Sequence, residues 1–144
     1  MGHSDADVLL HAVTDALLGG AALGDIGEMF PDTDLANRGR SSIEMLAAAR
    51  DAVVLAGWRI GNIDCIVLAE RPKLQPHKQA IRRVLAETLG VAIDQVGLQA
   101  KTGEGVGEIG REEVITAQCV ALLEPAVRPE KGSGFGVQES RNQP

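Results

Sequence analysis

The stretch MGHSDADVLLHAVTDALLGGAALGDIGEMFPDTD, residues 1–34, decides the expected fold of this chain. Its apolar residues recur at helical spacing and predict a helix over residues 5–19, with Ser4 or Asp5 as the N-cap. The side chains expected to face the core are Val8, Val13, Ala16, Leu17 and Ala21. Two glycines weaken the end of this helix, and the residues around Pro31 are typical of turns because proline fixes φ.

His11 lies four residues after Asp7 and four before Asp15. Residues four apart on a helix lie one turn apart, so all three side chains are expected on one face. Imidazole and carboxylate groups are common zinc ligands, which makes this face a candidate metal site. The alternative is a capped helix in which His11 is a hydrogen-bonded polar residue without a metal.

The rest of the chain alternates helices with strands. Ser41 and Glu44 form an S-x-x-E capping box before a helix expected over residues 42–56, and a further helix is expected over 76–89. Apolar, β-branched runs predict strands at 62–69 and 96–100, whereas 114–123 fits a strand or a helix and leans toward a strand. The pattern predicts an α/β or α+β domain with one sheet.

Composition narrows the class of protein. The chain has 144 residues, a net charge of −6 and only 2% aromatic residues, so the core must be aliphatic and binding to nucleic acid is not expected. No apolar run reaches the roughly 18 residues of a membrane span, and the start does not resemble a signal peptide, so we expect a cytoplasmic protein. Residues 1–124 form the expected domain, and the polar, glycine-rich residues 125–144 the expected disordered tail.

The two cysteines, Cys65 and Cys119, lie in apolar runs without C-x-x-C spacing. This pattern is typical of buried, reduced thiols.

A glycine-rich loop is expected over residues 101–111, KTGEGVGEIGR. It contains a G-x-G-x-x-G match, but a dinucleotide fold also needs a following helix and an acidic residue about 20 positions further on. Two alternatives stay open: a surface turn, or a phosphate-binding loop in which backbone N–H groups and Thr102 contact phosphate. In a phosphate-binding loop, the carboxylate of Glu104 would repel phosphate unless a cation such as Mg²⁺ bridged the two. Lys73 would be a second phosphate contact.

Three segments carry a resemblance to a known family: HSDADVLLHAVTDALLGGAALGDIGEMFPDTD, LAERPKLQPH and AKTGEGVGEIGR. From Gly2 to about Leu123 the chain closely resembles the 2-C-methyl-D-erythritol 2,4-cyclodiphosphate synthases of non-mevalonate isoprenoid biosynthesis. The resemblance implies a homotrimer of α/β subunits, each with a four-stranded mixed sheet covered by helices on one face. It also implies active sites between neighbouring subunits and a strand at 114–123.

The activity that the resemblance implies is that of a CMP-releasing phosphorus–oxygen lyase. The 2-phosphate of 4-diphosphocytidyl-2-C-methyl-D-erythritol 2-phosphate attacks the β-phosphoryl group, which closes a cyclic diphosphate and releases CMP. Such transfer depends on positioning and charge neutralisation. The implied cofactors are Zn²⁺ and a second divalent ion, Mg²⁺ or Mn²⁺.

The resemblance also implies roles for individual positions. His11 is the expected zinc ligand, Glu104 the expected ligand of the second metal, and His3 and Thr102 the expected transition-state stabilisers. Segments 25–27 and 30–34 would hold the methylerythritol part, and segments 69–75 and 101–104 the cytidine and its phosphates. The implied substrate-binding residues are His3, Ser4, Asp25, Ile26, Gly27, Phe30, Pro31, Asp32, Thr33, Asp34, Ala69, Glu70, Arg71, Pro72, Lys73, Leu74, Gln75, Lys101, Thr102, Gly103, Glu104 and Arg111.

In the family an N-terminal β-hairpin with a G-x-D-x-H motif supplies the other zinc ligands, and this chain starts after the corresponding position. Neither Asp7 nor Asp15 is a ligand in the family. Two alternatives follow: a non-catalytic trimer that binds cytidine nucleotides without a zinc site, and a zinc hydrolase that uses Asp7 and His11 directly.

Overall fold

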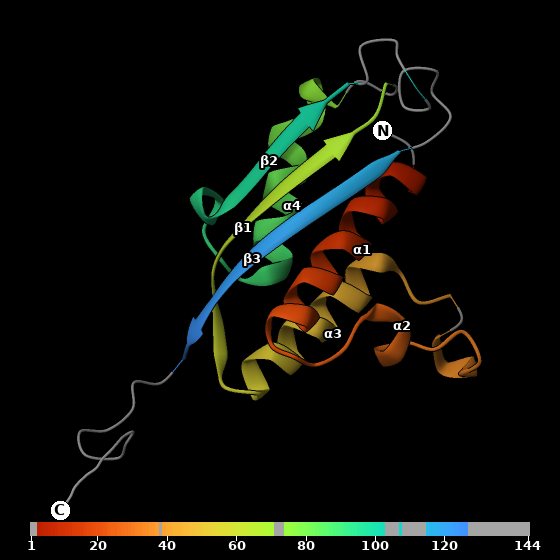
Figure 1. Cartoon of the computed structure of the whole chain (residues 1–144), viewed down its shortest axis with the longest axis vertical. Coiled ribbons are helices and arrows are strands. Elements are labelled where there is room, and N and C mark those ends of the chain that lie inside the picture. The colour runs from red at the N-terminus through yellow and green to blue at the C-terminus, as the bar shows by residue number, and fades with distance from the viewer. Residues whose placement is uncertain (1–2, 38, 71–73, 103–106, 108–114, 127–144) are drawn as a thin grey trace, which may run out of the picture.

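The computed structural model describes residues 3–37, 39–70, 74–102, 107 and 115–126. These residues form helices and a mixed β-sheet, and the helices cover one face of the sheet (Figure 1). The helices are α1 (His3–Gly20), α2 (Ile26–Met29), α3 (Ser42–Leu55) and α4 (Lys78–Leu89), and the strands are β1 (Trp58–Leu68), β2 (Val96–Lys101) and β3 (Thr116–Pro125). Within the described residues, no helix has the length and apolar character needed to cross a membrane.

The central strand of the sheet is β1, and the strand order is β2-β1-β3. β1 runs parallel to β2, from the pair Ile63–Val96 to the pair Leu68–Lys101, and α4 is the connection between them. β3 pairs antiparallel with the other side of β1. The carboxyl ends of β1 and β2 therefore meet at one edge of the sheet (Figure 1).

The core is aliphatic, as the composition predicts. It fills the space between the covered face of the sheet and the helices α1, α3 and α4. The side chains with 1% or less of their surface exposed include Val13, Leu17, Leu46, Val53, Ile63, Val67, Leu85 and Val96. Burial of this apolar surface is the main stabilising contribution.

Helix α1 buries more of its surface than the sequence predicts. Val13 and Leu17 are buried as expected, but the other three predicted core positions are only partly buried. The buried set instead comprises Leu9, Leu10, Val13, Thr14, Leu17 and Leu18, because α1 packs against both α3 and β3. The helix starts at His3, so Ser4 and Asp5 lie inside its first turn and the predicted N-cap is wrong.

The start of β1 also differs from the prediction. Gly57 has a φ of +99°, which lets the chain turn from α3 into a strand that begins at Trp58 instead of residue 62. The register shifts between Ile60 and Asn62, so Gly61 occupies a bulge. A Cβ atom on Gly61 would lie 3.2 Å from the Leu122 carbonyl oxygen, and the close approach of β3 explains the glycine.

Three further boundaries are corrected. The turn expected after Gly24 contains the short helix α2, and the predicted 76–89 helix begins as a 3₁₀ turn over Gln75–His77. The strand predicted over 114–123 is confirmed, but β3 begins at Thr116 and continues to Pro125. The Ala126 N–H donates to the Gly57 carbonyl at 2.8 Å. The rest of the predicted tail, residues 127–144, lies outside the described residues. The described part of the chain contains three strands, not the expected four.

Two leucines of α3 provide a matched test of this core. Leu46 has no exposed surface, whereas Leu55 is 89% exposed. Leu46→Ala is expected to lower the free energy of unfolding by about 2–5 kcal/mol, because it removes buried contacts and leaves a cavity. Leu55→Ala should change it by less than about 0.5 kcal/mol. Urea unfolding at one protein concentration measures both values, and equal losses would contradict the described core.

Candidate active site

The carboxyl ends of β1 and β2 bring together two of the segments expected around cytidine. The Ala69 N–H donates to the Lys101 carbonyl at 3.0 Å, directly beyond the paired strands. A small pocket of about 60 Å³ opens there, and its lining consists of Ala69, Leu74, Gln75, Ala100, Lys101 and Thr102. The start of α1, with His3 and Ser4, lies at the same end of the molecule (Figure 1).

A second polar cluster joins α1 to α3. The Ser42 hydroxyl donates to Asp7 Oδ1 at 2.7 Å, and Ser42 Oγ lies 3.1 Å from His11 Nε2. A serine hydroxyl has one proton, and here that proton is directed to the carboxylate. His11 must therefore donate from Nε2 to the serine oxygen, which in the neutral imidazole leaves Nδ1 as the atom with a free lone pair.

Ser42 is a residue that the sequence analysis missed. It belongs to the buried stripe of α3 that continues through Leu46, Ala49 and Val53, and it is only 8% exposed. Ser41 provides the predicted capping box with Glu44, so Ser42 is free to face α1. A serine on an otherwise apolar stripe needs a hydrogen-bond partner, and this signal was present in the sequence.

Asp15, the third member of the predicted face, holds α2 in place. Its Oδ1 accepts a hydrogen bond of 2.7 Å from the Ile26 N–H. Asp25 caps α2 by accepting from the Glu28 N–H, and Glu28 accepts from the Asp25 N–H, at 2.8 and 3.0 Å. The predicted segment 25–27 is therefore fixed against α1 by charge-assisted hydrogen bonds.

The predicted segment 30–34 forms a turn, as expected. Phe30 is buried, and the guanidinium of Arg40 lies 5.1 Å from the centre of its ring. Asp34 Oδ1 accepts from the Ala36 N–H at 3.0 Å, and the Pro31 carbonyl accepts from the Asn37 side chain at 2.9 Å. Asp32 and Thr33 are exposed, which leaves both side chains accessible to a ligand.

The described residues do not by themselves fit a zinc site. They contain no group of three His, Cys, Asp or Glu side chains placed to share a metal ion. Asp7 and His11 converge on Ser42, but Asp15 is engaged by α2, so the Asp7–His11–Asp15 face does not act as one ligand set. Zinc sites use three or four protein ligands, and His11 alone would be only one of them.

Several predicted site residues lie outside the described residues. They are Arg71, Pro72, Lys73, Gly103, Glu104 and Arg111. The glycine-rich loop therefore stays a prediction, and so do the roles of Lys73 and Glu104.

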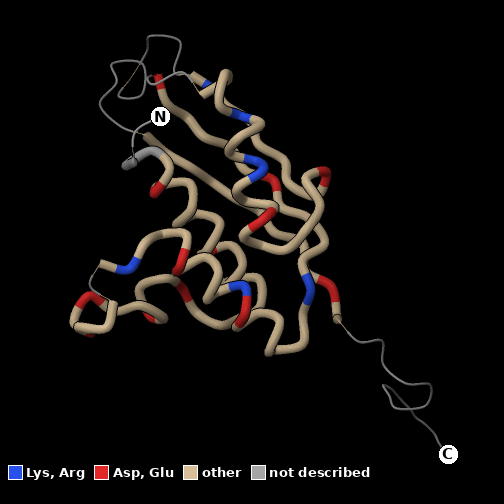
Figure 2. Tube along the Cα trace, turned by 180° about the vertical axis from the view of Figure 1, so that it is seen from behind, with Lys and Arg blue, Asp and Glu red and all other residues tan. Residues whose placement is uncertain are grey.

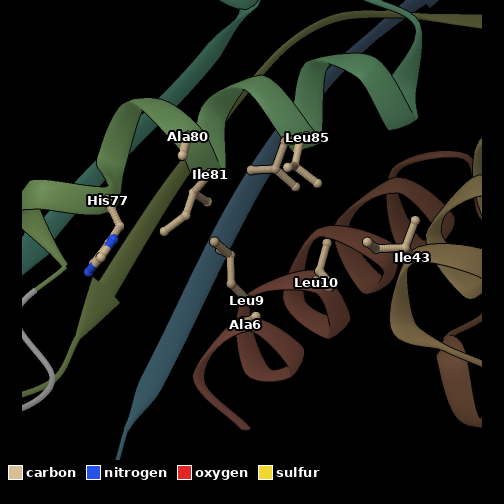
Figure 3. Close-up of a pocket in the computed structure, with 9 residues that line it drawn as sticks. Ala6, Leu9, Leu10, Ile43, His77, Ala80, Ile81 and Leu85 are labelled. Atoms are coloured by element: carbon tan, nitrogen blue, oxygen red, sulfur yellow. The ribbon is translucent and has the colours of Figure 1, made fainter. Parts of the chain in front are cut away.

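A larger groove of about 320 Å³ lies between α1 and α4 (Figure 3). The side chains that line it are Ala6, Leu9, Leu10, Ile43, His77, Ala80, Ile81, Val84 and Leu85, of which only His77 is polar. Such a lining offers little to a charged substrate. Elsewhere in the described chain, basic residues are scattered among acidic ones (Figure 2).

Known proteins with similar sequences and structures are consistent with this geometry. The 2-C-methyl-D-erythritol 2,4-cyclodiphosphate synthase of Gemmatimonas aurantiaca is 54% identical over 125 residues, which cover 84% of this chain and 75% of the relative. A solved structure of such a synthase in a CDP-bound form has a TM-score of 0.73 at 37% identity, over 80% of this chain and 74% of the other. The CDP complex of IspF from Plasmodium falciparum has a TM-score of 0.74 at 30% identity, over 87% and 75%.

The family comparison covers nearly all of the described residues. The profile of the YgbB family matches residues 1–124. This match and the identity to the synthases together show that the chain belongs to the YgbB family.

Proposed function

We propose that this chain is a 2-C-methyl-D-erythritol 2,4-cyclodiphosphate synthase that cyclises 4-diphosphocytidyl-2-C-methyl-D-erythritol 2-phosphate and releases CMP. One observation carries the proposal beyond the family match. The described residues of the two segments proposed for cytidine and its phosphates line one pocket, at the carboxyl ends of two parallel strands. Ligands of open α/β sheets bind in this position.

The pocket suits a nucleotide in its chemistry. Ala69 and Leu74 are buried and form an apolar surface for the flat base. Lys101 and Thr102 are exposed and provide a cation and a hydroxyl for the phosphates. CDP in two similar structures supports the same class of ligand.

The proposed reaction is an intramolecular phosphoryl transfer. An oxygen of the 2-phosphate forms a bond to the β-phosphorus, and the bond from that phosphorus to the oxygen shared with CMP breaks. The electron pair leaves with CMP, so the reaction needs neither water nor a protein nucleophile. The protein must hold the two groups in line and neutralise charge, for which we propose His3 and Thr102, with Lys73, Lys101 and Arg111 on the phosphates.

We further propose that segments 25–27 and 30–34 bind the methylerythritol part. Their backbone is fixed by the capping box of α2, by Asp15 and by the turn around Asp34. A rigid site loses less entropy when it binds its ligand, and this favours a fixed reaction geometry.

The metal proposal rests on the motifs alone. We propose His11 as one zinc ligand and Glu104 as a ligand of Mg²⁺ or Mn²⁺; bound, these ions would withdraw charge from the diphosphate. Because the described residues do not complete a zinc site, further ligands must come from other residues, and no step is assigned to the metal. The Asp7–Ser42 pair would orient His11, as second-shell groups do for other metal-bound histidines.

A cytoplasmic homotrimer with active sites between subunits is part of the same proposal. The helices cover one face of the sheet, and the other face exposes Val120 and Leu122 at 73% and 57%. We propose that these two side chains contribute to contacts between subunits. Sedimentation equilibrium should give three times the chain mass of 15.1 kDa.

The alternative is a trimer that binds cytidine nucleotides without turnover. The observation that favours it is that Asp7 and His11 converge on Ser42 while Asp15 is bound to α2, so these three side chains do not form one zinc site. The pocket at the strand ends, in contrast, is formed. This alternative would be supported by tight binding of CDP together with no release of CMP from 4-diphosphocytidyl-2-C-methyl-D-erythritol 2-phosphate in the presence of Zn²⁺ and Mg²⁺.

Thr102→Ala tests the proposed stabiliser. Loss of one hydroxyl at the reacting phosphoryl group is expected to lower kcat for CMP release by about 10²–10³-fold, with a much smaller loss of CDP affinity. Thr88→Ala is the matched control, because Thr88 lies on α4 and its hydroxyl donates to the Val84 carbonyl. Equal rates for the two variants would contradict the role of Thr102.

Ser42→Ala tests the orientation of His11. The NMR spectrum of ¹⁵N-labelled wild type should show the Nε2–H tautomer, and the variant should lose this preference because the acceptor is absent. Zinc affinity should fall about 10–100-fold. Ser41→Ala is the control, since Ser41 contacts only the Glu44 end of α3 in the described structure. An unchanged tautomer in Ser42→Ala would refute the proposed role.

A further inference from the structure

Cys65 and Cys119 are opposite each other across two antiparallel strands. They are direct partners in the register of β1 and β3, and their sulfur atoms lie 3.6 Å apart, with the Cys65 thiol as hydrogen-bond donor. Both are free thiols, as the sequence predicts. Cys65 has no exposed surface, but Cys119 is only partly buried, which the sequence does not predict.

The strand pairing places these residues within disulfide range. Opposite residues of antiparallel strands have Cα atoms about 4.5–5.5 Å apart, and disulfides span Cα distances of about 4.4–6.8 Å. The sulfur atoms can thus meet by side-chain rotation without a change of backbone register. We propose that Cys65 and Cys119 form a reversible oxidation site, which low-molecular-weight disulfides convert into a cross-strand disulfide.

Access to the pair is on the side of Cys119. An open hollow of about 500 Å³ between α1 and β3 reaches this residue. Its lining comprises Ala12, Asp15, Ala16, Ala117, Gln118, Cys119 and Val120. Three alanines leave the Cys119 sulfur approachable by a small reagent, whereas Cys65 lies behind it in the core.

The chemistry proceeds as two thiol–disulfide exchanges. The Cys119 thiolate attacks one sulfur of the reagent RSSR, which breaks the S–S bond, forms a mixed disulfide and expels RS⁻. This thiolate takes up the proton that Cys119 lost and becomes the first RSH. The Cys65 sulfur then attacks Cys119 Sγ, and the second RSH leaves with the Cys65 proton. Two protein thiols are oxidised and one reagent disulfide is reduced to two thiols.

The order of attack follows from burial. The hydrogen bond with Cys119, burial, and the negative charges of a Cys119 thiolate and of Asp64 all raise the pKa of the Cys65 thiol. Cys65 therefore stays protonated for as long as Cys119 has not reacted with the reagent. Once Cys119 carries the reagent, its thiolate charge is gone, and Cys65 is already in contact with the sulfur it attacks.

The bond would tie β3 to the central strand. In the described residues β3 is an edge strand that pairs with β1, and the bond would close a loop between positions 54 apart in sequence. Closing such a loop reduces the entropy of the unfolded chain. We therefore expect oxidation to raise Tm by on the order of 5–15 °C.

The test treats the native full chain with 2-hydroxyethyl disulfide, a small uncharged reagent. After alkylation, the oxidised chain should have the mass of the reduced chain minus two hydrogen atoms, with neither an alkyl group nor a hydroxyethylthio group attached. Peptide mapping should show a disulfide between Cys65 and Cys119. Dithiothreitol should restore both thiols and the original Tm. Disulfide-linked dimers, independent capping of the two cysteines, or no reaction at a reagent concentration that oxidises the unfolded chain would each overturn the proposal.

Two variants separate the entry thiol from its partner. Cys65→Ser should stop at a mixed disulfide on Cys119, and Cys119→Ser should stay unmodified because Cys65 is buried. Because both variants keep a thiol-sized side chain, circular dichroism should show native folding. Rapid capping of Cys65 in folded Cys119→Ser would contradict the proposed route.

Discussion

The parallel pairing of β1 with β2 is the constraint on which the proposed site depends. Six consecutive residue pairs, from Ile63–Val96 to Leu68–Lys101, fix the two strands relative to each other. A slip of one residue would move every side chain to the opposite face of the sheet, so the buried Ile63, Cys65 and Val67 maintain the register. The hydrogen bond from Ala69 to Lys101 extends this register to the pocket, where the two segments proposed for cytidine meet.

Helix α1 connects this core to the polar clusters. Its buried residues pack on α3 and β3, and its polar residues reach Ser42 on α3 and the start of α2. The same helix therefore positions the segment proposed for methylerythritol and the imidazole proposed for zinc. A displacement of α1 would disturb both, which couples packing in the core to the geometry of the site.

Much of this arrangement was predictable from local sequence. Helical spacing, the Ser41–Glu44 capping box and the β-branched runs identified the main helices and strands, and the long motifs identified the family. Ser42 and the bulge at Gly61 were missed, because both depend on which element packs opposite them. The opposition of Cys65 and Cys119 was missed for the same reason, since strand register is a long-range property. The predicted placement of Asp7, His11 and Asp15 on one helix face did not reveal that their hydrogen-bond partners are Ser42 of α3 and the Ile26 N–H of α2.

An NMR titration of the ¹⁵N-labelled chain with CDP distinguishes binding at the carboxyl ends of β1 and β2 from binding elsewhere. We expect the largest amide shifts at Ala69, Gln75, Lys101 and Thr102, with small shifts at the groove residues Ala80 and Val84. Shifts concentrated in the α1–α4 groove, or no saturable shifts at all, would contradict this expectation.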